Sequence, residues 1–203
     1  MQIDTSKIKS NHWSELLLQI NAYSNCYYYA RTISYKEFWD NSPRGDWLLH
    51  FVCNEGSTPR KLIVKAACQC ARLSLPYVKQ GELRPLKAIE TTERWLEDKA
   101  TIEEVKLAAD AAYDAYAYDY DAADAYAAAY AAYYAAYAAY AAAAYYAAYA
   151  ASDAASDASA ASAASAVKKE MQQKTADIVR RTIPMPTKAI KEFERLLTMK
   201  AFW

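Results

Sequence analysis

Residues 107–166 limit the possible folds of this chain more than any other segment. They consist almost entirely of Ala, Tyr, Ser and Asp, and they contain no Lys, Arg, Gly or Pro. Because Ala is the strongest helix former and both helix breakers are absent, helix is the only regular structure that this composition favours. The sequence therefore predicts an all-α helical bundle with this Ala/Tyr-rich tract at its centre, as a long helix or a helical hairpin.

The length of the tract predicts at least one break. A single helix of about sixty residues would be about 90 Å long. A compact chain of 203 residues has a radius of gyration of only about 17 Å. One candidate break is at residues 119–121. The favoured candidate is a cluster whose side chains can cap a new helix start, namely Ser152, Asp153, Ser156 and Asp157.

The tyrosines of the tract follow helical spacing. In one unbroken helix, five of them share a narrow stripe: Tyr126, Tyr130, Tyr133, Tyr137 and Tyr140. Four aspartates fall roughly on the opposite side: Asp110, Asp114, Asp121 and Asp124. The unbroken helix would therefore have an aromatic face and an acidic face.

The stripe has two interpretations. It can be core, with the acidic side in solvent. It can instead be a recognition surface, because buried phenol hydroxyls need hydrogen-bond partners and Tyr covers much contact area while ordering few torsions. On the second interpretation, the five tyrosines together with Asp114, Asp121 and Asp124 bind a partner.

Charge is segregated along the chain, although the formal net charge is zero. Residues 107–167 contain seven Asp and no base, whereas residues 168–203 contain nine bases and four acids. The neutral total argues against direct nucleic-acid binding. Residues 125–152 are uncharged but contain no Leu, Ile, Val or Phe, so no membrane span is expected. A polar N-terminus and four cysteines predict a cytoplasmic protein with reduced thiols.

The segments on both sides of the Ala/Tyr tract also have helical patterns, so one helical domain over residues 1–203 is expected. Its parts are N-terminal helices in 1–44, a helical core in 45–106, the Ala/Tyr tract in 107–166 and C-terminal helices in 167–203. The larger aliphatic and aromatic residues concentrate outside the tract. The main core is therefore expected outside the tract as well.

Several local signals mark helix starts. Ser34 with Glu37, and Thr101 with Glu104, have the spacing of capping boxes. Asp46 is expected to cap the helix that carries Trp47 and Phe51. Pro59 and Pro85 stand where first-turn prolines open helices.

Four segments and the tract carry a family resemblance. The chain resembles the immunity proteins of bacterial polymorphic toxin systems, whose relatives also occur in phages, over roughly residues 45–184. The resemblance lies in GDWLL at 45–49, LIVKAACQCARLSLPYV at 62–78, RPLKAIETTERWLEDKATIEEVKLAADAAY at 84–113 and ADIVRRTIP at 176–184. It implies a small cytoplasmic helical protein that neutralises a protein partner by binding it.

No catalytic residue, metal site or cofactor is predicted. Cys68 and Cys70 diverge on a predicted helix, which favours buried thiols, and His12 and His50 stand alone. Three arginines are candidate anion contacts, with pairing to acidic helices as their alternative role: Arg84, Arg180 and Arg181.

Three hypotheses of function follow. The leading one is a non-catalytic inhibitor that binds a toxin or a defence enzyme, as an immunity protein or a phage counter-defence protein. The second is a small-molecule binder in which phenols line a pocket and an arginine holds an anion such as a nucleotide. The third is a structural assembly, a homo-oligomer built by Ala-mediated helix packing. An enzyme is the class that the sequence favours least.

Overall fold

The computed structural model describes residues 10–118, 123–139, 144–159 and 162–200, and within them the chain is helical and contains no strand. The α-helices are α1 (Glu15–Gln19), α2 (Ser24–Ala30), α3 (Tyr35–Asn41), α4 (Gly45–Glu55), α5 (Arg60–Arg72), α6 (Arg84–Leu96), α7 (Ile102–Tyr118), α8 (Ala123–Tyr137), α9 (Tyr145–Asp157), α10 (Ala164–Thr182) and α11 (Lys188–Lys200). A short 3-10 helix, η2 (Leu75–Tyr77), follows α5. The predicted all-α bundle is confirmed.

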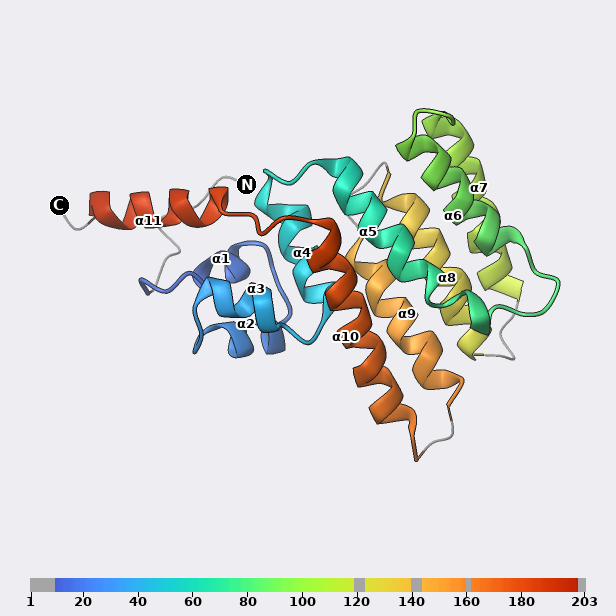
Figure 1. Cartoon of the computed structure of the whole chain (residues 1–203), viewed down its shortest axis with the longest axis horizontal. Helices are drawn as coiled ribbons and strands as arrows, with labels where there is room; N and C mark the ends of the chain where they lie inside the picture. The colour runs from blue at the N-terminus through green and yellow to red at the C-terminus, as the bar shows by residue number, and fades with distance from the viewer. Residues whose placement is uncertain (1–9, 119–122, 140–143, 160–161, 201–203) are drawn as a thin grey trace.

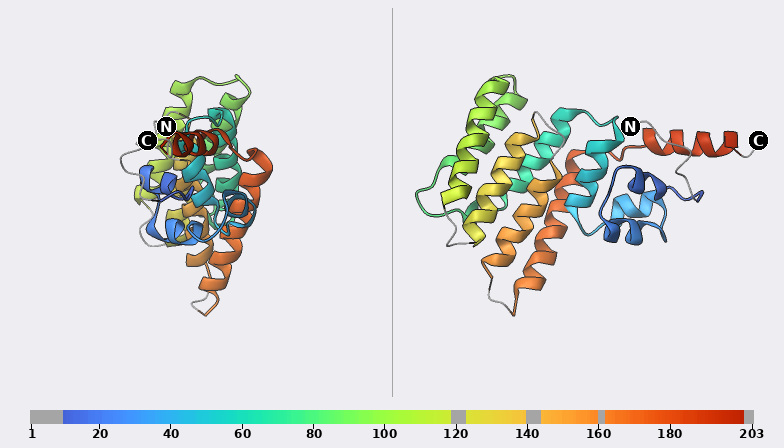
Figure 2. Two further views of the ribbon diagram at one scale, coloured as in Figure 1. Left: turned by 90° about the vertical axis from the view of Figure 1, so that its left-hand side faces the viewer. Right: turned by 180° about the vertical axis from the view of Figure 1, so that it is seen from behind.

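The helices of the body form two layers (Figures 1 and 2). In one layer α7, α8 and α9 lie side by side, with α8 between the other two. In the other layer α6 packs on α7 and α8, α5 packs on α8 and α9, and α10 packs on α9 and α4. The short helices α1, α2 and α3 gather beside α4 at one end, and α11 extends beyond them (Figure 1).

The Ala/Tyr tract is divided among α7, α8, α9 and the start of α10. One break falls at the first predicted candidate, because α7 ends at Tyr118 and α8 begins at Ala123; residues 119–122 themselves lie outside the described part. A second break falls at the favoured candidate, because α9 ends at Asp157 and α10 begins at Ala164, but the cluster lies at the end of a helix and does not cap the start of a new one. Ser152 lies inside α9, where its hydroxyl donates to the Ala148 carbonyl at 3.0 Å, and α9 continues to Asp157. A third break, between Tyr137 and Tyr145, was not predicted.

Alanine forms the interior of this layer. On α8, Ala128, Ala131, Ala132 and Ala135 are fully buried, and on α9 the same holds for Ala147, Ala151 and Ala154. Such small side chains let helix axes approach closely and lose no rotamer freedom on burial. The core therefore extends into the tract, which corrects the expectation that it lies mainly outside.

Larger side chains form the core at the other end. Phe38 and Phe51 are fully buried between the N-terminal helices and α4, and Phe193 of α11 is 1% exposed. The Tyr35 hydroxyl donates to the Pro186 carbonyl at 2.5 Å, which fixes the segment before α11. Among the described residues, no helix is both long enough and apolar enough for a bilayer crossing.

The helix starts predicted at Ser34, Thr101 and Pro85 are confirmed, and Pro85 lies in the first turn of α6. Pro59 was expected in the first turn of its helix but lies at the N-cap of α5, which begins at Arg60. In the Ser34 box, the Glu37 amide donates to the serine hydroxyl at 3.2 Å and Glu37 accepts from the Ser34 amide at 2.8 Å. The Thr101 box forms in the same way, with distances of 3.1 and 2.7 Å. Asp46 does not cap α4, because it lies in the first turn and pairs with Arg44 at 2.6 Å.

Candidate binding surface

Eight tyrosines form a continuous set of ring contacts across several helices. We call this set the tyrosine band: Tyr23, Tyr113, Tyr130, Tyr133, Tyr134, Tyr137, Tyr145 and Tyr146. Tyr113 belongs to α7, four members belong to α8, two open α9, and Tyr23 precedes α2. None of the eight is buried, and Tyr113 and Tyr23 at the two ends are 46% and 38% exposed.

The band is densest on α8. The Tyr130 and Tyr134 rings meet edge to face with centroids 4.5 Å apart, and their hydroxyls share a hydrogen bond of 2.7 Å. Tyr133 lies 4.9 Å from Tyr134 and 5.3 Å from Tyr113 of α7. Each ring is therefore held by at least one other ring, which restricts its torsions before any partner binds.

Tyr146 carries the band from α8 to α9. Its ring lies 4.5 Å from that of Tyr134 and 4.1 Å from that of Tyr145. Tyr145 then contacts the His50 ring of α4 edge to face at 4.7 Å. His50 Nε2 lies 2.9 Å from the Ile20 carbonyl, so Nε2 carries the proton. His50 Nδ1 is buried without a hydrogen-bond partner in the described part of the chain, and the ring serves packing.

Partial burial raises the pKa of four phenols of the band. It raises the pKa of Tyr23 to about 12, and it raises the pKa of Tyr134 and Tyr145 further above that of a free phenol. The pKa of Tyr133 is also raised, first by burial and then by neighbouring phenols and Asp110. Near neutral pH these four hydroxyls are therefore uncharged, and each can donate and accept hydrogen bonds.

The structure brings together three tyrosines of the predicted stripe: Tyr130, Tyr133 and Tyr137. Tyr126 belongs to α8, but its side chain and the whole of Tyr140 lie outside the described part. Sequence reasoning missed the other five members, because they come from neighbouring helices, from the segment before α2 or from the flank of α8. Helical spacing gives the stripe of a single helix, whereas the band forms only when three helices pack.

The predicted acidic side does not oppose the tyrosines as a single helix would require. Asp110 and Asp114 are exposed on α7, the helix that also carries Tyr113. Asp110 lies close enough to Tyr133 to raise the pKa of its phenol. Asp124 is partly exposed in the first turn of α8, and Asp121 lies outside the described residues. Because α7 and α8 are separate helices that pack side by side, Asp110 lies beside the band.

The three candidate anion contacts have different surroundings. The Arg84 guanidinium binds Glu82 through Nε and Nη2, at 2.9 and 2.5 Å, and lowers the pKa of that carboxyl. The Arg180 guanidinium donates to the Trp39 carbonyl at 2.8 Å, to the Ser42 carbonyl, and to Asp177 at 2.8 Å. Arg181 is exposed on α10, with no ion pair to any described residue.

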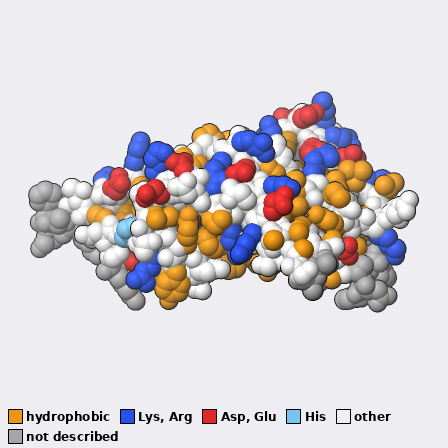
Figure 3. All heavy atoms as spheres, turned by 60° about the horizontal axis from the view of Figure 1, so that its bottom comes forward, with side chains coloured by type: hydrophobic (Ala, Val, Ile, Leu, Met, Phe, Trp, Pro, Cys, Tyr) orange, Lys and Arg blue, Asp and Glu red, His pale blue; other side chains and the backbone are white. Residues whose placement is uncertain are grey.

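The described residues contain no group of three or more metal-ligating side chains, so they hold no candidate metal centre. Cys26, Cys68 and Cys70 are buried, and burial raises the pKa of each thiol. On the face shown in Figure 3, positive and negative side chains alternate with apolar ones, and the described side chains form no broad basic surface there.

Comparisons with known proteins identify no relative. No family model, curated protein or solved structure matches this chain.

Proposed function

We propose that this protein is a non-catalytic inhibitor that binds a protein partner through the tyrosine band, as a toxin immunity protein or a phage counter-defence protein. The observation that carries the proposal is the band itself: eight linked, partly exposed phenols contributed by α7, α8, α9 and the segment before α2. The resemblance to immunity proteins supports the choice of partner class.

Ring contacts within the band favour binding because they reduce the entropy lost on association. A protein interface loses about 0.5–1.5 kcal/mol for each flexible side chain that it immobilises. Tyr has few torsions, and ring packing at 4.5–5.3 Å already limits those of Tyr113, Tyr133 and Tyr134. The free surface is thus close to the ordered state that a partner would require.

Charge at the α7 end of the band favours a basic partner. Asp110 and Asp114 are exposed next to the α7 end of the band, and residues 107–167 contain no base. A partner with a positive surface would gain attraction on approach, which raises association rates and suppresses acidic competitors. Enzymes that process nucleic acids have such surfaces, and they are the partner class that we propose.

A growth assay tests the proposal. Any toxin that is found to be encoded beside this gene is co-expressed in bacteria with the wild-type protein, with Tyr113→Ala or with Tyr133→Ala. Wild type should restore growth, and each variant should weaken toxin binding by about 30-fold or more, the effect expected when an interface hot spot is truncated. Binding is measured by calorimetry with the purified pair.

Tyr28→Ala is the matched control, because Tyr28 is 61% exposed and lies outside the band. The Tyr28→Ala variant should protect bacteria from the toxin as well as wild type does. Circular dichroism melts confirm that all three variants fold. Full protection by a folded Tyr113→Ala, Tyr133→Ala double variant would refute the assignment of the band as the contact surface.

A further inference from the structure

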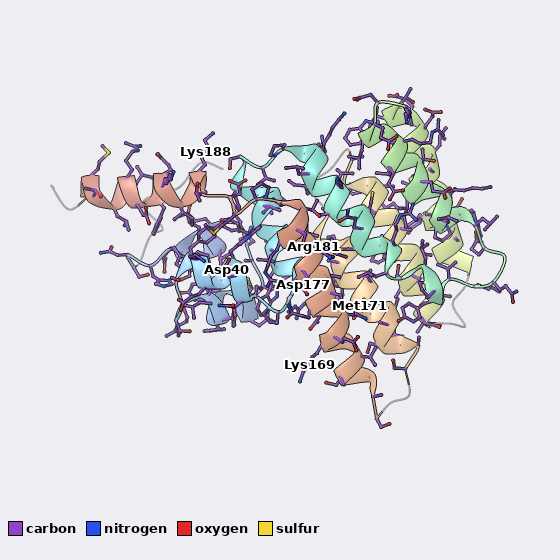
Figure 4. All side chains as sticks on the ribbon, in the orientation of Figure 1. Asp40, Lys169, Met171, Asp177, Arg181 and Lys188 are labelled. Carbon is purple, nitrogen blue, oxygen red and sulfur yellow. The ribbon has the colours of Figure 1, made fainter. Side chains whose placement is uncertain are left out.

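We propose that a surface hollow between α5 and α10 binds the phosphate group of a small phosphate monoester. The hollow has a volume of about 460 Å³ and is lined by Lys65, Gln69, Ile178, Arg181 and Thr182. Figure 4 shows Arg181 where α10 passes α5. None of these residues belongs to the tyrosine band, so the site is independent of the function proposed above.

The polar groups that line this hollow are suited to an anion. Lys65 and Arg181 are both exposed, and neither forms an ion pair with any described residue. The Thr182 hydroxyl donates to Gln69 Oε1 at 2.8 Å, so the Gln69 amide nitrogen retains its two N–H donors. The lining contains no carboxylate. Ammonium, guanidinium and amide donors without a competing acid favour an oxyanion ligand.

The nearest acid on α10 is already engaged. Asp177 lies one turn before Arg181, and it accepts from Arg180 at 2.8 Å and from Gln173 at 3.0 Å. The guanidinium of Arg181 is therefore the cation of this turn that remains available. Arg180 is directed toward the carbonyls of Trp39 and Ser42, and it takes no part in the site.

An adjoining hollow can hold the organic part of the ligand. It has a volume of about 410 Å³, shares Lys65 and Gln69 with the first, and is also lined by Leu62, Cys68 and Leu96. Its two acids have partners of their own: Glu93 binds Arg72 at 2.5 Å and Glu97 binds Lys99 at 2.7 Å. A ligand with a phosphate and a compact apolar body would place the phosphate at Lys65 and Arg181 and the body near Leu62.

Calorimetry on the full chain at low ionic strength tests this site with three probes: inorganic phosphate, phenyl phosphate and phenol. Phenyl phosphate should bind saturably and more tightly than phosphate, and phenol should not bind. Arg181→Gln and Lys65→Gln should each weaken phenyl phosphate binding by about tenfold or more, because each removes a charged donor. Gln69→Glu should weaken it further, since it places a carboxylate in the lining.

Lys169→Gln is the matched control, because Lys169 is an exposed cation near the other end of α10 (Figure 4). It should leave binding unchanged. Equal losses in Lys169→Gln and Arg181→Gln would show general charge attraction and overturn the site, as would the absence of saturable binding by either phosphate probe. Equal affinity for phosphate and phenyl phosphate would overturn the role given to the adjoining hollow.

Discussion

Replacing Gly45 with Ala should destabilise the protein by about 2 kcal/mol, because α4 and α10 meet at this glycine. A Cβ at Gly45 would lie 2.5 Å from the backbone carbonyl carbon of Thr175, and ordinary contact begins at about 3.4 Å. The two helices must therefore separate by roughly 1 Å, and overpacking of this kind costs about 1–3 kcal/mol. Because the clashing atom belongs to the backbone and cannot rotate away, we take the upper end, about 3 kcal/mol. Ala in a helix regains about 0.5–1 kcal/mol over Gly, which leaves a net loss of about 2 kcal/mol.

Urea unfolding and thermal melting measure this effect. A loss of about 2 kcal/mol lowers Tm by about 4–8 °C in a chain of this size. Thr175→Ala on the Gly45→Ala background should recover little stability, because it removes the hydroxyl but leaves the carbonyl carbon in place. Gly81→Asn is a comparison for backbone strain without overpacking: Gly81 has φ +88° and nothing within 4 Å of an added Cβ, and Asn is among the side chains that adopt positive φ, so this variant should cost less stability than Gly45→Ala. A Gly45→Ala variant as stable as wild type would refute the close approach.

Three further predictions concern stability. Arg180→Gln should cost about 2 kcal/mol in urea unfolding, because it removes charged hydrogen bonds to the carbonyls of Trp39 and Ser42, and it should leave phosphate binding unchanged. Glu55→Gln should cost about 1–3 kcal/mol by the same measure, because this buried carboxylate accepts from the amides and hydroxyls that follow α4. Stability should fall as pH rises from about 10 toward 12, because the pKa of Tyr23 is about 12 when folded and about 10 when unfolded; urea midpoints that stay constant over this window would contradict the assignment.

The helical class and most helix starts could be predicted because their causes are local. The Ser34 and Thr101 boxes join groups three residues apart, and Ala propensity acts at every position of the tract. The turn between Tyr137 and Tyr145 has no such signal, since the chain there is only Ala and Tyr. Packing of α8 against α9 offsets the cost of interrupting a favourable helix, and this gain cannot be read from local sequence.

The same contrast between local causes and contacts made only on folding applies to the candidate sites. Tyr130, Tyr133 and Tyr137 were predictable as a set because one helix carries them, whereas Tyr113 and Tyr146 join them only through contacts between helices. Arg181 was identified from its residue type, but Lys65 and Gln69 lie on α5, more than a hundred residues away in the sequence. Residues that meet only after folding give no spacing signal.

Ala and Tyr have different roles in the packing of these helices, and the difference explains why phenols are exposed. Alanine lets α7, α8 and α9 approach closely, but each buried methyl contributes little hydrophobic stabilisation, roughly 0.8 kcal/mol. Tyr rings at the edges of the same helices bury much more area while their hydroxyls stay near water. Tyr134 shows both features. Its ring centroid lies 4.5 Å from those of Tyr130 and Tyr146, and its hydroxyl shares a hydrogen bond with that of Tyr130. The rings that stabilise this Ala-based layer are therefore also partly exposed at its surface, where we propose that a partner binds.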